Sequence, residues 1–173
     1  MATNTTNLGL IKPAVNSATD EDLWGGQINS NLDSLDSEAV LKTVDLDFAD
    51  NTLSKPVLKD YAEELETDTS TSNVWTIDFE DGNHHEIVLG ENITTITISN
   101  APSTGNVGLL VLYIKQDGTG GRTVSFPSSI KWAGGASPTV TSTASRTDII
   151  TLITRDGGTT FAGSVMGQDY TGI

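Results

Sequence analysis

Short stretches of alternating apolar and polar residues dominate the chain from residue 74 onward. This two-residue period is typical of β-strands with one buried face. Residues 108–114 are almost wholly apolar and predict a central strand that is covered on both faces. Residues 155–158, Arg-Asp-Gly-Gly, lie between two such stretches and predict a hairpin turn. We expect strands at 74–79, 84–89, 93–98, 108–114, 123–126, 130–132, 148–154 and 160–165.

About eight short strands at regular spacing favour a mainly β fold, with an antiparallel β-sandwich or jelly-roll-like domain over residues 74–173. Asp81-Gly82-Asn83 is a turn signal and predicts a hairpin between the first two of these strands. The polar run at residues 67–73 predicts the linker that precedes this domain.

A helical period replaces the two-residue period between residues 19 and 41. Four apolar residues recur there at spacings of four, three and four. The stripe is too narrow to face a large core, and it predicts a short helix that packs against copies of itself. A second helix is expected from Ser54 to about Thr67. Residues 19–73 are therefore interpreted as a helical and linker region for oligomerisation, with Ile28, Leu32, Leu35 and Ala39 at the contact.

Residues 1–18 are polar and contain few apolar side chains, which is typical of an extended arm rather than a packed element. Such an arm becomes ordered on a partner, so we interpret it as an anchor. The candidate anchoring residues are Leu8, Leu10, Ile11, Pro13 and Trp24.

The charge narrows the range of partners. The formal net charge is −14, and residues 1–72 carry most of the excess acid. Such a chain repels phosphate backbones and anionic membranes, so neither nucleic-acid binding nor membrane insertion is expected. No apolar run approaches the roughly 20 residues that span a bilayer. The absence of cysteine excludes disulfides and thiolate metal sites. The N-terminal sequence lacks the pattern of a signal peptide, so synthesis in a cytosol is expected.

Candidate chemistry is sparse, and neither a catalytic site, a metal site nor a cofactor is predicted. His84 and His85 are adjacent, so in a strand they point to opposite faces. One of them could meet its copies around a symmetry axis and bind a metal, but a surface histidine beside Glu86 is the commoner arrangement. Asp78, Glu80 and Asp81 form an acidic cluster whose usual role is a solvated turn; a glycosidase pair or a calcium site is the alternative.

Several stretches contain recognisable motifs: 7–13 (NLGLIKP), 24–25 (WG), 28–33 (INSNLD), 52–62 (TLSKPVLKDYA), 110–124, 126–132 and 156–161 (DGGTTF). These stretches resemble virion proteins of tailed bacteriophages, often described as tail or fibre proteins. The resemblance implies an N-terminal anchor and a distal β domain, usually as a homotrimer, in a virion assembled in the host cytoplasm. Its partners would be other virion proteins, from the capsid, the tail or an adaptor.

A short fibre-like appendage, with a β domain that can attach to the host surface, is the function this resemblance favours. Two alternatives remain open: a capsid decoration or head-fibre protein, and a carbohydrate depolymerase that uses Asp78 and Glu80. If the β domain binds a host-surface glycan, aromatic faces that stack on sugars are candidates, although most of them suit a core equally well. These residues are Trp75, Tyr113, Trp132 and Phe161.

Overall fold

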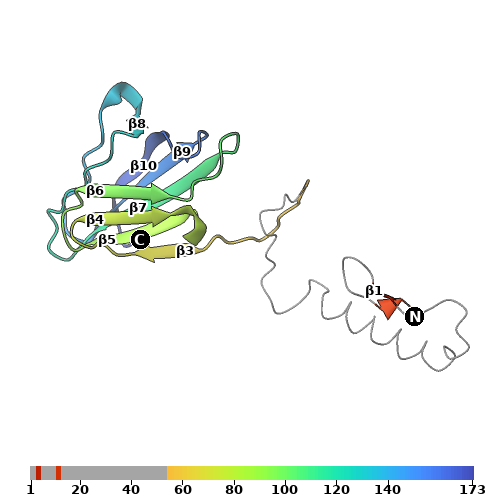
Figure 1. Ribbon diagram of the computed structural model, residues 1–173. Helices are drawn as coiled ribbons and strands as arrows, with labels where there is room; N and C mark the ends of the chain where they lie inside the picture. The colour runs from red at the N-terminus through yellow and green to blue at the C-terminus, as the bar shows by residue number, and fades with distance from the viewer. Residues whose placement is uncertain (1–2, 5–10, 13–53) are drawn as a thin grey trace, which may run out of the picture. The chain divides into compact units, whose positions relative to one another are not determined.

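The computed structural model describes Thr3–Asn4, Ile11–Lys12 and residues 54–173. The chain divides into two units, Met1–Val57 and Leu58–Ile173. In the first unit, strand β1 (Thr3–Asn4) pairs antiparallel with β2 (Ile11–Lys12). We call the second unit, Leu58–Ile173, the β domain (Figure 1).

The β domain contains eight strands and two 3₁₀ turns among its described residues. They are β3 (Leu65–Asp68), β4 (Val74–Asp78), η1 (Phe79–Asp81), β5 (His84–Leu89), β6 (Thr95–Ser99), β7 (Gly108–Gln116), β8 (Ile130–Trp132), η2 (Ala133–Gly135), β9 (Arg146–Thr154) and β10 (Phe161–Thr171). Figure 1 shows the segment that carries β8 projecting from one end of the domain. Within the described part of the chain, no helix is long and apolar enough to cross a membrane.

The strands form two sheets. The larger sheet has the order β3-β5-β7-β9-β10-β8, and the smaller sheet pairs β4 with β6. From β3 to β7 the chain changes sheet at every step. β4, β5 and β6 therefore each serve as the crossover between two strands of the other sheet, which makes the pairs β3–β5, β4–β6 and β5–β7 parallel. Only the pairs β7–β9 and β9–β10 of this domain are antiparallel.

One apolar core joins the two sheets. The alternation predicted from the sequence positions its side chains, because every second residue of a strand points to the same face. Trp75 and Ile77 on β4 and Leu110 and Leu112 on β7 are completely buried. The same cluster contains Ile87, Leu89, Ile93, Ile96, Ile114, Ile130, Val140, Ile150, Leu152 and Phe161.

The mainly β fold is confirmed, but the expected antiparallel arrangement is wrong, because the larger sheet is mixed and the smaller sheet is parallel. The hairpin expected at Asp81-Gly82-Asn83 is also wrong. That turn connects β4 to β5, which belong to different sheets. The hairpin at residues 155–158 is confirmed, since β9 and β10 pair antiparallel across it.

The second predicted helix, from Ser54 to Thr67, is wrong. Residues 54–64 form no helix, and β3 begins at Leu65. The predicted apolar stripe is not buried: Val57 is 95% exposed and Tyr61 is 67% exposed. A helical period stabilises a helix only where its stripe packs against a partner, and here strand pairing with β5 holds the end of the segment instead.

Two further expectations for residues 1–53 lie largely outside the described residues: the helix at 19–41 and the extended arm at 1–18. The proposed oligomerisation residues Ile28, Leu32, Leu35 and Ala39 lie outside them, as do Leu8, Leu10, Pro13 and Trp24. Ile11 is described, and it lies in β2 opposite Asn4.

Candidate binding pocket on the outer sheet face

The larger sheet has one face on the core and one face that the rest of the described chain leaves partly uncovered. We call the second the outer face. A sheet face in contact with water normally carries polar side chains, whereas the outer face exposes several apolar ones. Leu109 on β7 and Ile153 on β9 are directly opposite each other and are 45% and 47% exposed. Val88 on β5 is 52% exposed.

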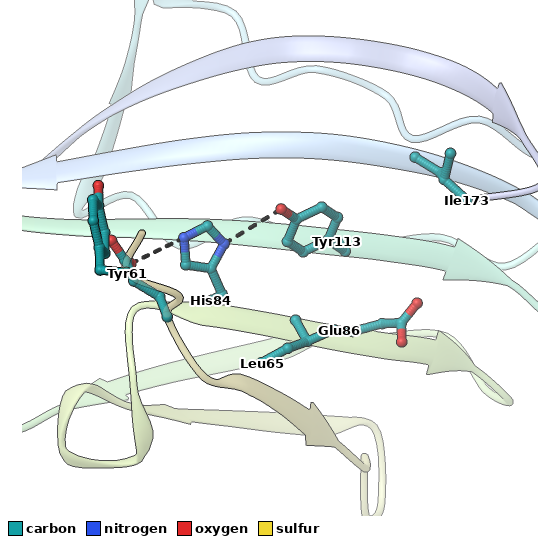
Figure 2. Close-up of a pocket in the computed structure, with 7 residues that line it drawn as sticks. Tyr61, Leu65, His84, Glu86, Tyr113 and Ile173 are labelled. Atoms are coloured by element: carbon teal, nitrogen blue, oxygen red, sulfur yellow. Dashed lines mark hydrogen bonds and ion pairs between the residues drawn. The ribbon is translucent and has the colours of Figure 1, made fainter. Parts of the chain in front are cut away.

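A pocket of about 660 Å³ opens on this face where β3, β5 and β7 lie side by side (Figure 2). One wall comes from the segment that leads into β3. His84 and Glu86 on β5 and Tyr113 on β7 form the floor, because alternate residues of neighbouring strands point to the same face. The lining residues are Tyr61, Glu63, Leu65, His84, Glu86, Tyr113 and Ile173.

His84 connects the two sides of the pocket. Its Nε2 atom lies 3.1 Å from Glu63 Oε2, and its Nδ1 atom lies 3.3 Å from the Tyr113 hydroxyl. The His84 and Tyr113 rings stack with centroids 6.0 Å apart and an interplanar angle of 27°. A neutral imidazole satisfies both polar contacts: Nε2–H donates to Glu63, and the Tyr113 hydroxyl donates to Nδ1.

The pocket therefore combines two carboxylates, two phenol rings and an imidazole, and Tyr61 leaves two-thirds of its side chain uncovered. The Glu86 carboxylate forms no ion pair with any described residue. No group of three metal-ligating side chains occurs in the part of the chain that the structure describes. This arrangement suits binding through stacking and charge.

His85 points to the opposite face, as the sequence predicts. It is completely buried, and its Nδ1 atom lies 3.0 Å from Asp68 Oδ2 while its Nε2 atom lies 3.1 Å from the Gly82 carbonyl oxygen. Trp75 Nε1 donates to the same Asp68 oxygen at 2.7 Å. Burial alone lowers the pKa of His85, but the hydrogen bond and charge of Asp68 and the Gly82 carbonyl outweigh it and raise the pKa. The contact between Asp68 and His85 therefore stabilises the pairing of β3 with β5.

The acidic cluster at the end of β4 has a structural arrangement. Asp78 accepts the backbone N–H of Glu80 at 3.0 Å, and its two oxygens accept the Asn100 amide at 2.8 Å each. These donors lower the pKa of Asp78, the backbone hydrogen bond from Glu80 most of all. Asp78 thus caps the η1 turn, and a glycosidase acid would require the opposite shift.

Comparison with known families decides the identity. A family profile described as "Putative phage tail fibre C-terminal domain" matches residues 68–159, more than half of the chain. The chain belongs to this family. It is therefore a tail-fibre-type structural protein and a component of the virion, as its sequence resemblance implies. Neither a curated protein nor a solved structure matches the chain.

The residues matched by the tail-fibre family include the floor of the pocket but not the wall formed by the segment that leads into β3. His84, Glu86 and Tyr113 lie inside the matched span, whereas Tyr61 and Glu63 precede it. The sequence did not indicate those two residues as part of a site, because Tyr61 recurs with Val57 and Leu65 at a spacing of four and so resembled one face of a helix. No short-range signal could have placed them over β5.

The four candidate glycan-stacking residues of this tail-fibre protein divide into two groups. Trp75 and Phe161 are buried in the core and present no free face, so that assignment is wrong for them. Tyr113 lines the pocket, and Trp132 is half-buried beside Phe126, with ring centroids 5.0 Å apart.

Proposed function

We propose that this chain is a short tail-fibre subunit whose β domain attaches the particle to the host surface. The observation that carries the proposal is the outer-face pocket: a tail-fibre domain presents exposed aromatic and ionic groups in a concave site that its own described residues leave open. Aromatic rings and a few polar groups are the usual composition of a ligand site.

A direct test uses the full-length purified protein. It is expected to bind host cells and, when added in excess, to reduce adsorption of the phage to them. A matched protein with Tyr61→Ala and Tyr113→Ala is expected to lose both effects while keeping its strand content by circular dichroism. A wild-type protein that neither binds cells nor competes with the phage would refute attachment through this domain.

The proposal assigns residues 1–18, together with Trp24, to docking on another virion protein. The candidate contacts are Leu8, Leu10, Ile11, Pro13 and Trp24. This docking protein belongs to the capsid, the tail or an adaptor. Deleting residues 1–20 is expected to abolish incorporation into particles while the protein still oligomerises in solution. Particles that incorporate the truncated chain at the normal level would show that the anchor lies elsewhere.

The proposal also includes a homotrimer, with residues 19–73 as the oligomerisation region and the Ile28, Leu32, Leu35 and Ala39 stripe at the contact. The exposed apolar pair Leu109 and Ile153 supports association, because copies of the chain would cover it. Assembly takes place in the host cytoplasm, and the role requires no catalysis or cofactor. Sedimentation of the full chain tests this, and a monomer at high protein concentration would contradict it.

A further inference from the structure

We infer that the outer-face pocket binds a protonated amine carried on a sugar-sized carbon frame, such as a hexosamine with a free amino group. The inference rests on the proposed attachment function and names the ligand class of the same pocket. It follows from the charges, the aromatic faces and the position of His84 in the pocket.

The charge of the pocket selects for a cation. Glu63 and Glu86 supply two carboxylates, and His84 is the one basic side chain among the described lining residues. The described lining residues therefore include two carboxylates and no lysine or arginine side chain, and His84 contacts the Glu63 carboxylate at 3.1 Å. The nearby Lys115 ammonium donates to the carbonyl oxygen of the lining residue Ile173 at 2.9 Å.

An anionic sugar is disfavoured in this pocket because both carboxylates repel it. A neutral sugar is disfavoured for a different reason: it would cover Glu86, which has no ion-pair partner among the described residues, without supplying a charge. An ammonium group supplies three donors and the missing positive charge, and charge-assisted hydrogen bonds to carboxylates are the stronger class.

The aromatic side chains add a second source of selectivity. Figure 2 shows Tyr61 and Tyr113 on opposite sides of His84, and the Tyr61 side chain is largely exposed. An aromatic face attracts a cation and also stacks on the apolar face of a sugar ring. A frame that carries both an ammonium group and an apolar face uses all of these groups together.

The test measures the binding of glucosamine, N-acetylglucosamine, glucose and glucuronate to the full-length protein by saturation-transfer NMR at neutral pH. Glucosamine is expected to bind at least about tenfold more tightly than the other three, since one charge-assisted contact contributes about that factor. Equal binding of glucosamine and glucose, or no binding of glucosamine, would overturn the inference.

Matched variants locate the site. Glu86→Gln is expected to weaken glucosamine about tenfold. Glu80→Gln removes the same charge outside the pocket lining and is expected to leave the affinity unchanged. Tyr61→Leu should weaken binding, whereas Tyr61→Phe should preserve it. Equal losses in Glu86→Gln and Glu80→Gln would mean that net charge alone attracts the amine, which would refute the site.

The two proposals fail in different ways. A wild-type protein that binds host cells, together with a Glu86→Gln protein that binds them equally well, leaves attachment intact and refutes the amine-binding pocket. A wild-type protein that binds glucosamine in the pocket but does not bind host cells refutes attachment and leaves the pocket intact.

Discussion

The buried contact between Asp68 and His85 gives the sharpest prediction about stability. Asp68→Asn keeps the shape of the side chain but removes its charge. The remaining amide oxygen can accept from Trp75 Nε1, which lies 2.7 Å from the present carboxylate oxygen, but it cannot also form an ion pair with His85. The perturbation therefore removes one charge-assisted contact from a completely buried histidine.

The expected loss is about 2–4 kcal/mol in the free energy of unfolding. A hydrogen bond to a charged group contributes about 1.5–3 kcal/mol, and removing one partner of a buried pair costs about 3–5 kcal/mol. His85 limits the cost because it can release its proton. With a urea m-value of about 1.5 kcal/mol per molar, the unfolding midpoint should fall by about 2 M.

The loss should depend on pH. Because the pKa of His85 is raised in the folded protein above its ordinary value of 6.5, the contribution of the pair is complete below pH 6.5. It disappears as the pH rises through the folded pKa. The difference between wild type and Asp68→Asn should therefore be largest near about pH 5.5 and much smaller near about pH 9.

Urea unfolding followed by circular dichroism at both pH values measures this difference. Glu66→Gln is the matched control, because it removes the same charge from the same strand and Glu66 forms no ion pair with the described residues. An equal loss in the control, or a loss for Asp68→Asn that is independent of pH, would refute the reasoning.

Three other substitutions test the packing around this sheet. Asp148 is buried and accepts the backbone N–H groups of Thr141 and Asp169 at 2.6 and 3.0 Å, and these donors outweigh burial and lower its pKa. Asp148→Asn should cost about 2–4 kcal/mol, and the loss should shrink in acid as the wild-type carboxyl takes up its proton; a constant loss in an acid-unfolding series would contradict this. Leu112→Ala should cost about 2–5 kcal/mol by urea unfolding, because Leu112 is completely buried, and a loss below about 1 kcal/mol would contradict the core described above. Gly120 has a φ of 73°, and a Cβ atom added there would lie only 2.6 Å from the Ser142 carbonyl oxygen. Gly120→Ala should therefore lower stability by about 1–3 kcal/mol in thermal unfolding, and an unchanged Tm would refute the strain.

The sequence predicted the strands well because each is short and has a clear two-residue period. It placed seven of the described strands close to their positions, and it predicted the β9–β10 hairpin from Arg155-Asp156-Gly157-Gly158. It also predicted that His84 and His85 face opposite ways. These properties depend on residues that are near one another in the chain.

Strand pairing was not predictable in the same way. Asp81-Gly82-Asn83 is compatible with a hairpin or with a connection between sheets, and only the packing of β4 against β5 across the core distinguishes them. The segment around Tyr61 and Glu63 has a helical spacing, but its position over β5 depends on the pairing of Leu65 with His84. Half of the pocket therefore arises from a tertiary contact that no local pattern records.

The position of this protein on the particle tests the central claim most directly. Gold-labelled antibodies against the β domain, bound to intact particles and viewed by electron microscopy, would reveal both the site and the number of copies. The account predicts label at the tail only, at a few to tens of copies per particle. Label spread over the head at hundreds of copies would contradict a tail-fibre subunit and favour a capsid decoration protein.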